Sequence, residues 1–278
     1  MSAVTTSARG GMRVPKAFVD GAVVAKRNLI KIKRVPDLLV FSTLSPIMFI
    51  LLFAYVFGSA IPVFPGSSSS VYREYLIPGI FVQTVIFGAT ITGAGLADDI
   101  QKGIIDRFRS LPMSRSAVLV GRTTSDLLNN VLVLVIMSIT GLIVGWRIRG
   151  GVVDAIAAYL LLLAFAYAIS WVMALIGLVV PTPEVVNNAS FMVIFPVTFI
   201  ANTFVPTQHF PTVLMAISNW NPVSAATQAC RDLFGNPSPE VHTWPLQHAA
   251  LYTLLWAAAC VAVFLPLSVR RYNKVAAR

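Results

Sequence analysis

Charged residues are scarce in this sequence. Only 12% of its 278 residues are Asp, Glu, Lys or Arg, whereas 56% are hydrophobic and the mean hydropathy is +0.77. An ordinary soluble domain is about 25% charged, and a soluble chain of this length needs more polar surface than these residues supply. The composition therefore argues against a soluble enzyme, a disordered chain and a disulfide scaffold, and it favours a membrane protein.

Cysteine and histidine are scarce as well. The two cysteines, Cys230 and Cys260, have no CxxC spacing, and the three histidines have no HExxH or similar spacing. We interpret both cysteines as small, inert apolar side chains. The histidine spacing gives no reason to expect a metal site.

The sequence also lacks the parts of a self-powered pump. It contains no GxxxxGK[ST] segment, which would cradle the phosphates of ATP. The segments between the apolar stretches reach at most about 40 residues, which is too short for a nucleotide-binding domain. A proton-driven carrier usually needs a relay of ionisable residues inside its spans, and only Asp126 falls inside one. If the protein pumps, the driving force has to come from a partner.

Six stretches are apolar enough to cross a bilayer, which takes about 20 mostly apolar residues in a helix. We therefore predict an all-α membrane protein with six transmembrane helices. The predicted spans are about 38–61, 75–97, 124–145, 155–180, 185–205 and 247–268. The predicted domains are a disordered N-terminus at 1–15, an amphipathic interface helix at 16–36, a transmembrane domain at 37–270 and a cytoplasmic tail at 271–278.

The basic residues are distributed unevenly between the two sides of the predicted spans. Seventeen of the 21 Lys and Arg residues lie before span 1, between spans 2 and 3, or after span 6, and four lie on the other side. Because Lys and Arg are enriched in cytoplasmic loops, this distribution places both termini in the cytoplasm, in a multi-pass protein of the cytoplasmic (inner) membrane. The net charge of +10 would suggest nucleic acid in a soluble protein; here it is explained by topology, and we expect no nucleic-acid partner.

Residues 16–34 have the pattern of a basic amphipathic helix. Five apolar side chains share one face at helical spacing: Phe18, Ala22, Ala25, Leu29 and Ile32. Such a helix suits the cytoplasmic headgroup layer of the membrane, and Pro36 turns the chain into the first span. The helix either only anchors the chain to the membrane surface or also contacts a partner protein.

The segment 206–235, on the outer side before span 6, does not have the pattern of a membrane span. It contains two pieces of about ten residues, each too short to cross the membrane. The pieces follow Pro211 and begin at Pro222, positions that a first helical turn accepts, and Gly235 closes the second. We predict a re-entrant or interfacial hairpin, which either gates an outward exit or only covers the ends of the spans.

Two adjacent amides, Asn187 and Asn188, stand near the start of predicted span 5. Amides that enter a span are costly in lipid unless they face protein or a cavity. We therefore regard them as candidates for a translocation path.

The cytoplasmic segment 98–115 between spans 2 and 3 is short and dense in charge. Four of its apolar residues recur at the spacing of one face of a short helix: Ile104, Ile105, Phe108 and Leu111. Asp98 and Asp99 stand where that helix would begin, and acidic residues there favour its dipole. An aromatic anchor on a charged helix is suited to docking on another protein. The alternative is a plain basic loop that only sets the topology.

Two patterns in these segments resemble a known family. The run Asp-x-x-x-Gly-x-x-x-Arg-x-Arg-Ser-Leu-Pro-Met-Ser-Arg, from Asp99 to Arg115, is similar to the loop after span 2 of ABC-2 type permeases. The likeness continues with Gly121-Arg122 and Asp126. The second pattern, Phe210-Pro211, Asn221-Pro222 and Arg231, resembles the outer hairpin of the same family.

The most similar group is that of daunorubicin/doxorubicin resistance permeases, and the likeness extends over about residues 16–270. Many members carry Glu where Asp99 stands, and Thr-Leu-Glu where Ile104-Ile105-Asp106 stands. The acidic character is kept at both positions.

The resemblance implies the permease half of an ATP-driven ABC exporter. Two such permeases, either identical or paralogous, would pair above two separate ATPase subunits, which would carry ATP and Mg while this chain binds no cofactor. The substrate would be a hydrophobic drug, polyketide or lipid moved outward, so the protein would act in efflux and antibiotic resistance. The segment 98–109 would be the coupling helix. The residues implied in coupling are Asp98, Asp99, Lys102, Gly103, Ile104, Ile105, Asp106, Arg107, Phe108 and Arg109.

Two other classes of function stay open at this point. A self-contained channel or carrier would transport in liposomes without an ATPase, and the shortage of ionisable residues inside the spans argues against it. A membrane enzyme or assembly factor would need convergent nucleophile, base or metal ligands, and nothing in the sequence places His209 and Asp232 together.

Overall fold

The computed structural model describes residues 36–58, 60–104 and 117–275. The disordered segment predicted at 1–15 and, apart from Pro36, the amphipathic helix predicted at 16–36 lie outside them. All regular elements of the described residues are helices. In chain order these are α2 (Pro36–Leu51), η1 (Leu52–Phe57), α3 (Ser69–Gln101), α5 (Ala117–Val144), α6 (Val152–Val179), α7 (Pro183–Ile200), η2 (Thr207–His209), α8 (Thr212–Trp220), α9 (Pro222–Phe234), α10 (Trp244–Gln247) and α11 (Ala249–Val275).

Five of these helices, α3, α5, α6, α7 and α11, are long and apolar enough to cross a membrane. The first predicted span corresponds to α2 and the π-helix η1, which follow one another directly. Its apolar part, Thr43–Phe57, is shorter than the other five. The prediction of an all-α, multi-pass membrane protein is confirmed, and the six-span layout stays a prediction.

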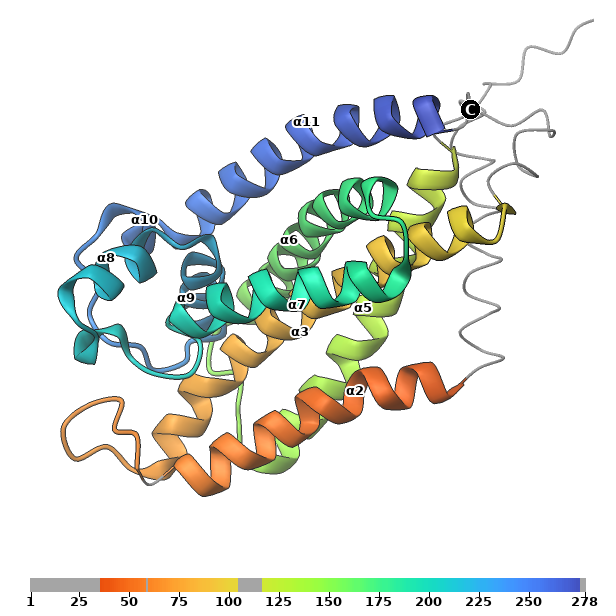
Figure 1. Ribbon diagram of the computed structural model, residues 1–278. Helices are drawn as coiled ribbons and strands as arrows, with labels where there is room; N and C mark the ends of the chain where they lie inside the picture. Colours follow the sequence, from red (N-terminus) through yellow and green to blue (C-terminus); the bar gives the residue numbers. More distant parts are fainter. Residues whose placement is uncertain (1–35, 59, 105–116, 276–278) are drawn as a thin grey trace, which may run out of the picture.

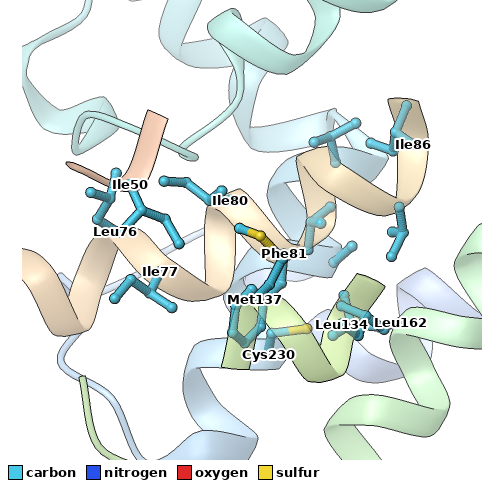
Figure 2. Packing of buried hydrophobic residues seen from close by; sticks show 14 of the residues in the cluster. Ile50, Leu76, Ile77, Ile80, Phe81, Ile86, Leu134, Met137, Leu162 and Cys230 are labelled. Carbon is cyan, nitrogen blue, oxygen red and sulfur yellow. The ribbon is translucent and has the colours of Figure 1, made fainter. Parts of the chain in front are cut away.

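Helix α3 is the centre of the bundle and packs against α5, α6, α7 and α9 (Figure 1). Its residues from Glu74 to Ile86 are buried without interruption. Figure 2 shows how side chains of α2, α5, α6 and α9 meet those of α3 around Phe81. Phe81 also makes edge-to-face contacts with Trp146 and Phe234, at centroid distances of 5.3 and 6.3 Å, an arrangement that aromatic rings favour.

Glycines allow the backbones of α3 and α6 to approach closely. A Cβ on Gly93 would lie 2.7 Å from the carbonyl oxygen of Met173, and a Cβ on Gly177 would collide with the carbonyl group of Gly93. In lipid the association of helices depends on such close packing, because the solvent is as apolar as the side chains. This contact therefore fixes how α6 crosses the central helix.

Large apolar side chains cover much of the outer surface of the bundle. Ile143 of α5, Met192 of α7 and Leu255 of α11 are exposed by 79, 79 and 54%. A soluble protein rarely exposes apolar surface on this scale. These faces are suited to lipid or to another membrane subunit.

The hairpin predicted over 206–235 is present as α8 and α9. Asn221 caps α9 by accepting a hydrogen bond from the backbone N–H of Val223 at 2.9 Å, and Pro222 occupies the first turn. Gly235 ends α9 with φ +68°, a left-handed conformation that glycine adopts without steric cost. The short helix α10 that follows was not predicted. This hairpin and α10 lie at one end of the bundle, whereas α3 ends, α5 begins and α11 ends at the other (Figure 1).

Candidate functional site

The segment predicted to couple the protein to a partner begins on α3. This helix runs through Asp98 and Asp99 to Gln101, so the expectation that the two carboxylates begin a separate helix is wrong. Gly103 then turns the chain with φ +64°, and its N–H donates to the carbonyl oxygen of Ile100 at 3.0 Å. The two aspartates therefore stand at the carboxyl end of a helix, where the dipole is unfavourable to them, and they need cations nearby.

Both aspartates have such a cation. The Nζ atom of Lys102 lies 2.8 Å from Oδ2 of Asp98, in an exposed pair one helical turn apart. Nη1 of Arg122, on α5, lies 3.7 Å from Oδ2 of Asp99. Ile104 is half-buried. Ile105, Asp106, Arg107, Phe108 and Arg109 lie outside the described residues, so the docking face that they would complete stays a prediction.

Arg122 is the centre of a second set of contacts, the Arg122 cluster, which consists of Thr92, Asp99, Arg122 and Asp126. Nε of Arg122 lies 3.4 Å from Oδ2 of Asp126, and Nη2 donates to the carbonyl oxygen of Ile91 at 3.2 Å. Asp126 is only 7% exposed and also accepts a hydrogen bond of 2.6 Å from Oγ1 of Thr92. A buried carboxylate is tolerated when it is paired and hydrogen-bonded in this way.

Gly95 makes room for the Arg122 cluster. A Cβ at residue 95 would collide with the guanidinium group of Arg122, which lies across this point of α3. The sequence shows the i, i+4 spacing of Arg122 and Asp126, a spacing typical of helical ion pairs. It does not show that the pair meets α3, and the role of Gly95 was missed for that reason.

A separate cluster of apolar side chains packs at this end of the bundle. Leu96, Leu119, Trp171, Leu178 and Tyr272 are buried together and come from α3, α5, α6 and α11. Arg122 holds together the ends of α3 and α5, which are joined in the chain by the segment 105–116.

We expect Gly95→Ala to destabilise the protein by about 1–3 kcal/mol, because a side chain forced into a filled site displaces Arg122 from its carboxylates. In an Arg122→Ala background the same change should be neutral or stabilising by about 0.5–1 kcal/mol, the usual gain when alanine replaces glycine in a helix. Thermal unfolding of the four proteins in detergent completes this double-mutant cycle. An equal loss of stability in both backgrounds would contradict the role given to Gly95.

Asn187 and Asn188 are both exposed, near the beginning of α7. A cavity of about 510 Å³ lies between α2, α3, α5 and α7, and it is lined by Phe191 and Phe195 of the same helix. Asn187 and Asn188 are not among the described residues that line this cavity. Their place on a path stays a prediction, and sequence reasoning did not single out the polar residues of the cavity.

Comparisons with known proteins show the family of the chain. Residues 22–234 match the family described as ABC-2 type transporter. The chain is 35% identical to the daunorubicin resistance ABC transporter permease protein DrrB1 of Streptomyces coeruleorubidus, over 89% of this chain and 83% of that protein. It is 24% identical to the putative transport permease ycf38 of Cyanophora paradoxa, over 78% and 74% of the two chains. It is 23% identical to the probable doxorubicin resistance ABC transporter permease protein DrrC of Mycobacterium tuberculosis, over 81% and 78%.

Proposed function

This chain belongs to the ABC-2 type transporter family, and from that premise we propose that it moves a hydrophobic drug, polyketide or lipid outward across the cytoplasmic membrane. It is a permease subunit of an ABC exporter and not an enzyme, and ATP hydrolysis takes place on a separate ATPase subunit. The alternatives of a self-contained carrier and of an assembly factor are set aside by this membership.

The length of α3 is the observation that supports the coupling role. At 1.5 Å per residue its 33 residues span about 50 Å, whereas the hydrocarbon core of a bilayer is about 30 Å thick. The helix is therefore longer than the hydrocarbon core is thick, and its carboxyl-terminal end carries Asp98 and Asp99, with Lys102 and Gly103 directly after it. We assign to the segment 98–109 the part of a coupling helix that docks on the ATPase.

The assembly that we propose has two permeases, identical or paralogous, and two ATPase subunits. Six spans, with α2 and η1 as the first, place both termini in the cytoplasm and the hairpin of α8 and α9 on the outer side. ATP and Mg bind to the ATPase subunits, and this chain carries no cofactor. Asn187 and Asn188, exposed near the inner end of α7, are suited to the entrance of a path shared between two permeases.

Purification in mild detergent tests this proposal. The tagged chain should copurify with an ATPase that contains a GxxxxGK[ST] segment, and the ATP hydrolysis of the complex should rise when a hydrophobic drug is added. The control is the purified permease alone in liposomes, which should not transport under an ion gradient. Transport by that control, without any ATPase, would overturn the proposal.

A further inference from the structure

A second cavity, of about 560 Å³, lies beside α8 and is bounded by α6, α7 and α11. Both α7 and α11 pack against α6, which lies between them (Figure 1). The floor of the cavity is buried, since Phe165 and Met173 of α6 are 0 and 5% exposed. Its rim is open, since Val193 of α7 and Trp220 of α8 are 64 and 62% exposed. The cavity is therefore a groove from the surface of the bundle toward its core, which we call the outer groove.

The outer groove offers an occupant almost no polar partner. Thr198 and Asn221 are the residues of the described lining that carry a hydroxyl or an amide, and both are paired within the protein. Oγ1 of Thr198 donates to the carbonyl oxygen of Phe195 at 3.0 Å, and Nδ2 of Asn221 donates to that of Val197 at 2.8 Å. Oδ1 of Asn221 accepts from the N–H of Val223 at 2.9 Å. A polar ligand would lose its hydration here without compensation, so the occupant is apolar.

The outer groove extends over about the depth of one leaflet. At its rim, the hydroxyl of Tyr252 donates to the carbonyl oxygen of Trp220 at 3.0 Å, and Trp and Tyr are the residues that collect at the membrane–water interface. Leu161 of α6 packs with Ala249, the first residue of α11. At 1.5 Å per residue, Met173 lies about 18 Å deeper along α6 than Leu161, and half of the hydrocarbon core is about 15 Å thick. The groove therefore begins at the headgroups and ends near the middle of the bilayer.

A single lipid chain fits this space better than a protein segment does. An α-helix with its side chains is about 10–12 Å wide, so that only 10 Å of its length occupies roughly 800–1,100 Å³. That is more than the whole groove, so a helix of a second copy could lie across the groove but not fill it. The amphipathic helix predicted at 16–34 belongs to the cytoplasmic side, at the other end of the bundle.

We propose that the outer groove holds one acyl chain of a phospholipid from the outer leaflet, with the ester end of the chain beside Trp220 and its methyl end beside Met173. The described lining carries no charged side chain, so the chain and not the headgroup is recognised. The inference goes beyond the proposed function, from which it takes only the assignment of α8 and α9 to the outer side.

Photolabelling of the full-length permease in lipid nanodiscs tests this inference without transport or an ATPase, so its failure is distinct from failure of export. The probes are two phosphatidylcholines, added as minor components, that carry a diazirine near either the ester or the terminal methyl of one chain. Peptide mass spectrometry should locate the first label on α8 and the second on α6, within 169–173. Absence of both labels from the groove would overturn the inference, whereas reversed positions would overturn the outer placement of α8 as well.

Val197→Trp and Val131→Trp are a matched pair of variants for this experiment. Val197 lines the groove and is 39% exposed, whereas Val131 of α5 is 37% exposed and is not among the described residues of the lining. Val197→Trp should fill the groove and lower labelling within 169–173 by about tenfold or more, and Val131→Trp should leave it unchanged. Ile217→Trp fills the groove from α8 and should give the same loss if Val197→Trp does not insert in the membrane.

The melting temperature gives a second readout, because a ligand that binds only the folded protein stabilises it by mass action. Phosphatidylcholine added to the delipidated protein in detergent should raise the melting temperature of the wild type and of Val131→Trp, and should raise that of Val197→Trp much less. Equal labelling within 169–173 in the wild type and in both filled variants would show lipid that only surrounds the bundle. That result, or an equal rise in melting temperature for all three proteins, would overturn the inference.

Discussion

Arg231→Met should strongly destabilise the protein, with a loss in the free energy of unfolding on the order of 3–5 kcal/mol. For a chain of this size such a loss corresponds to a fall in melting temperature on the order of 10 °C. Methionine fills a similar volume without a charge, so the loss reports the guanidinium group and not a cavity. Thermal unfolding in detergent, followed by size-exclusion chromatography, measures the effect.

The reason lies in the contacts of the Arg231 guanidinium group. Arg231 is fully buried on α9; its Nε donates to the carbonyl oxygen of Tyr75 at 2.8 Å, and its Nη2 donates to those of Asn202 and Thr203 at 2.8 and 3.2 Å. Its Cζ atom lies 3.5 Å from the centroid of the Tyr75 ring, a favourable cation–π distance. One side chain thus joins α9 to α3 and to the turn after α7. Without it, the carbonyl groups of Tyr75 and Thr203 lose the hydrogen bond from Arg231, and that of Asn202 keeps only the bond from the Tyr75 hydroxyl.

Arg147→Met is the matched control, because Arg147 is exposed at the same end of the bundle. Its replacement should change stability by no more than about 0.5 kcal/mol. Arg231→Lys should fall between the two, since lysine keeps the charge but lacks the planar fork of donors. A melting temperature of Arg231→Met equal to that of Arg147→Met would show that the buried contacts contribute little.

The sequence was most informative where the signal was local. Composition alone indicated a membrane protein, and proline and glycine marked the hairpin because their effect on the backbone does not depend on distant residues. Pro222 and Gly235 bound α9 as predicted, and Asn221 caps it. Both cysteines were expected to be inert apolar side chains, and both are buried.

The contacts that define the candidate site could not be read in the same way. They join residues far apart in the chain, and which faces of α3 and α5 meet depends on the packing of the whole bundle. The end of α3 was misplaced because Asp98 and Asp99 fit a helix start by charge, and the compensating Arg122 is supplied by another helix. The composition of span 3 likewise gave no sign that Asn130 lines a cavity or that Asp126 forms an ion pair beside α3.

Three contacts repeat along the interface of α3 and α5. Gly88 faces Asn130, Thr92 donates a hydrogen bond to Asp126, and Gly95 faces Arg122. The three residues on α5 are four positions apart, and their partners on α3 are four and then three positions apart. The row runs from the cavity to the Arg122 cluster. In the coupling that we propose, a change in the distance between the two helix ends reaches the walls of the cavity along this row.

Gly103→Asp should abolish ATP-driven export while leaving insertion of the protein in the membrane intact. The expectation rests on the proposed docking of the segment 98–109 on an ATPase. A new carboxylate in a closely packed protein interface, without a cation to pair with it, costs several kcal/mol. The effect on the fold is small, since an acidic residue at the carboxyl end of a helix costs about 0.3–1 kcal/mol. ATP-dependent uptake of a drug into inside-out vesicles measures export, and copurification measures docking.

Gly103→Asn distinguishes the effect of a new negative charge from the effect of replacing glycine at this backbone conformation. The φ of +64° at Gly103 is unfavourable for most side chains, but Asn and Asp both enter this region more readily than other residues. The two are almost identical in shape, so Gly103→Asn should keep most of the export that Gly103→Asp loses. Phe108→Asp should reproduce the loss, because it places a carboxylate at the predicted aromatic anchor. Normal export from Gly103→Asp would refute docking at this position, and equal loss in Gly103→Asn would show that the turn, and not the charge, is what the partner requires.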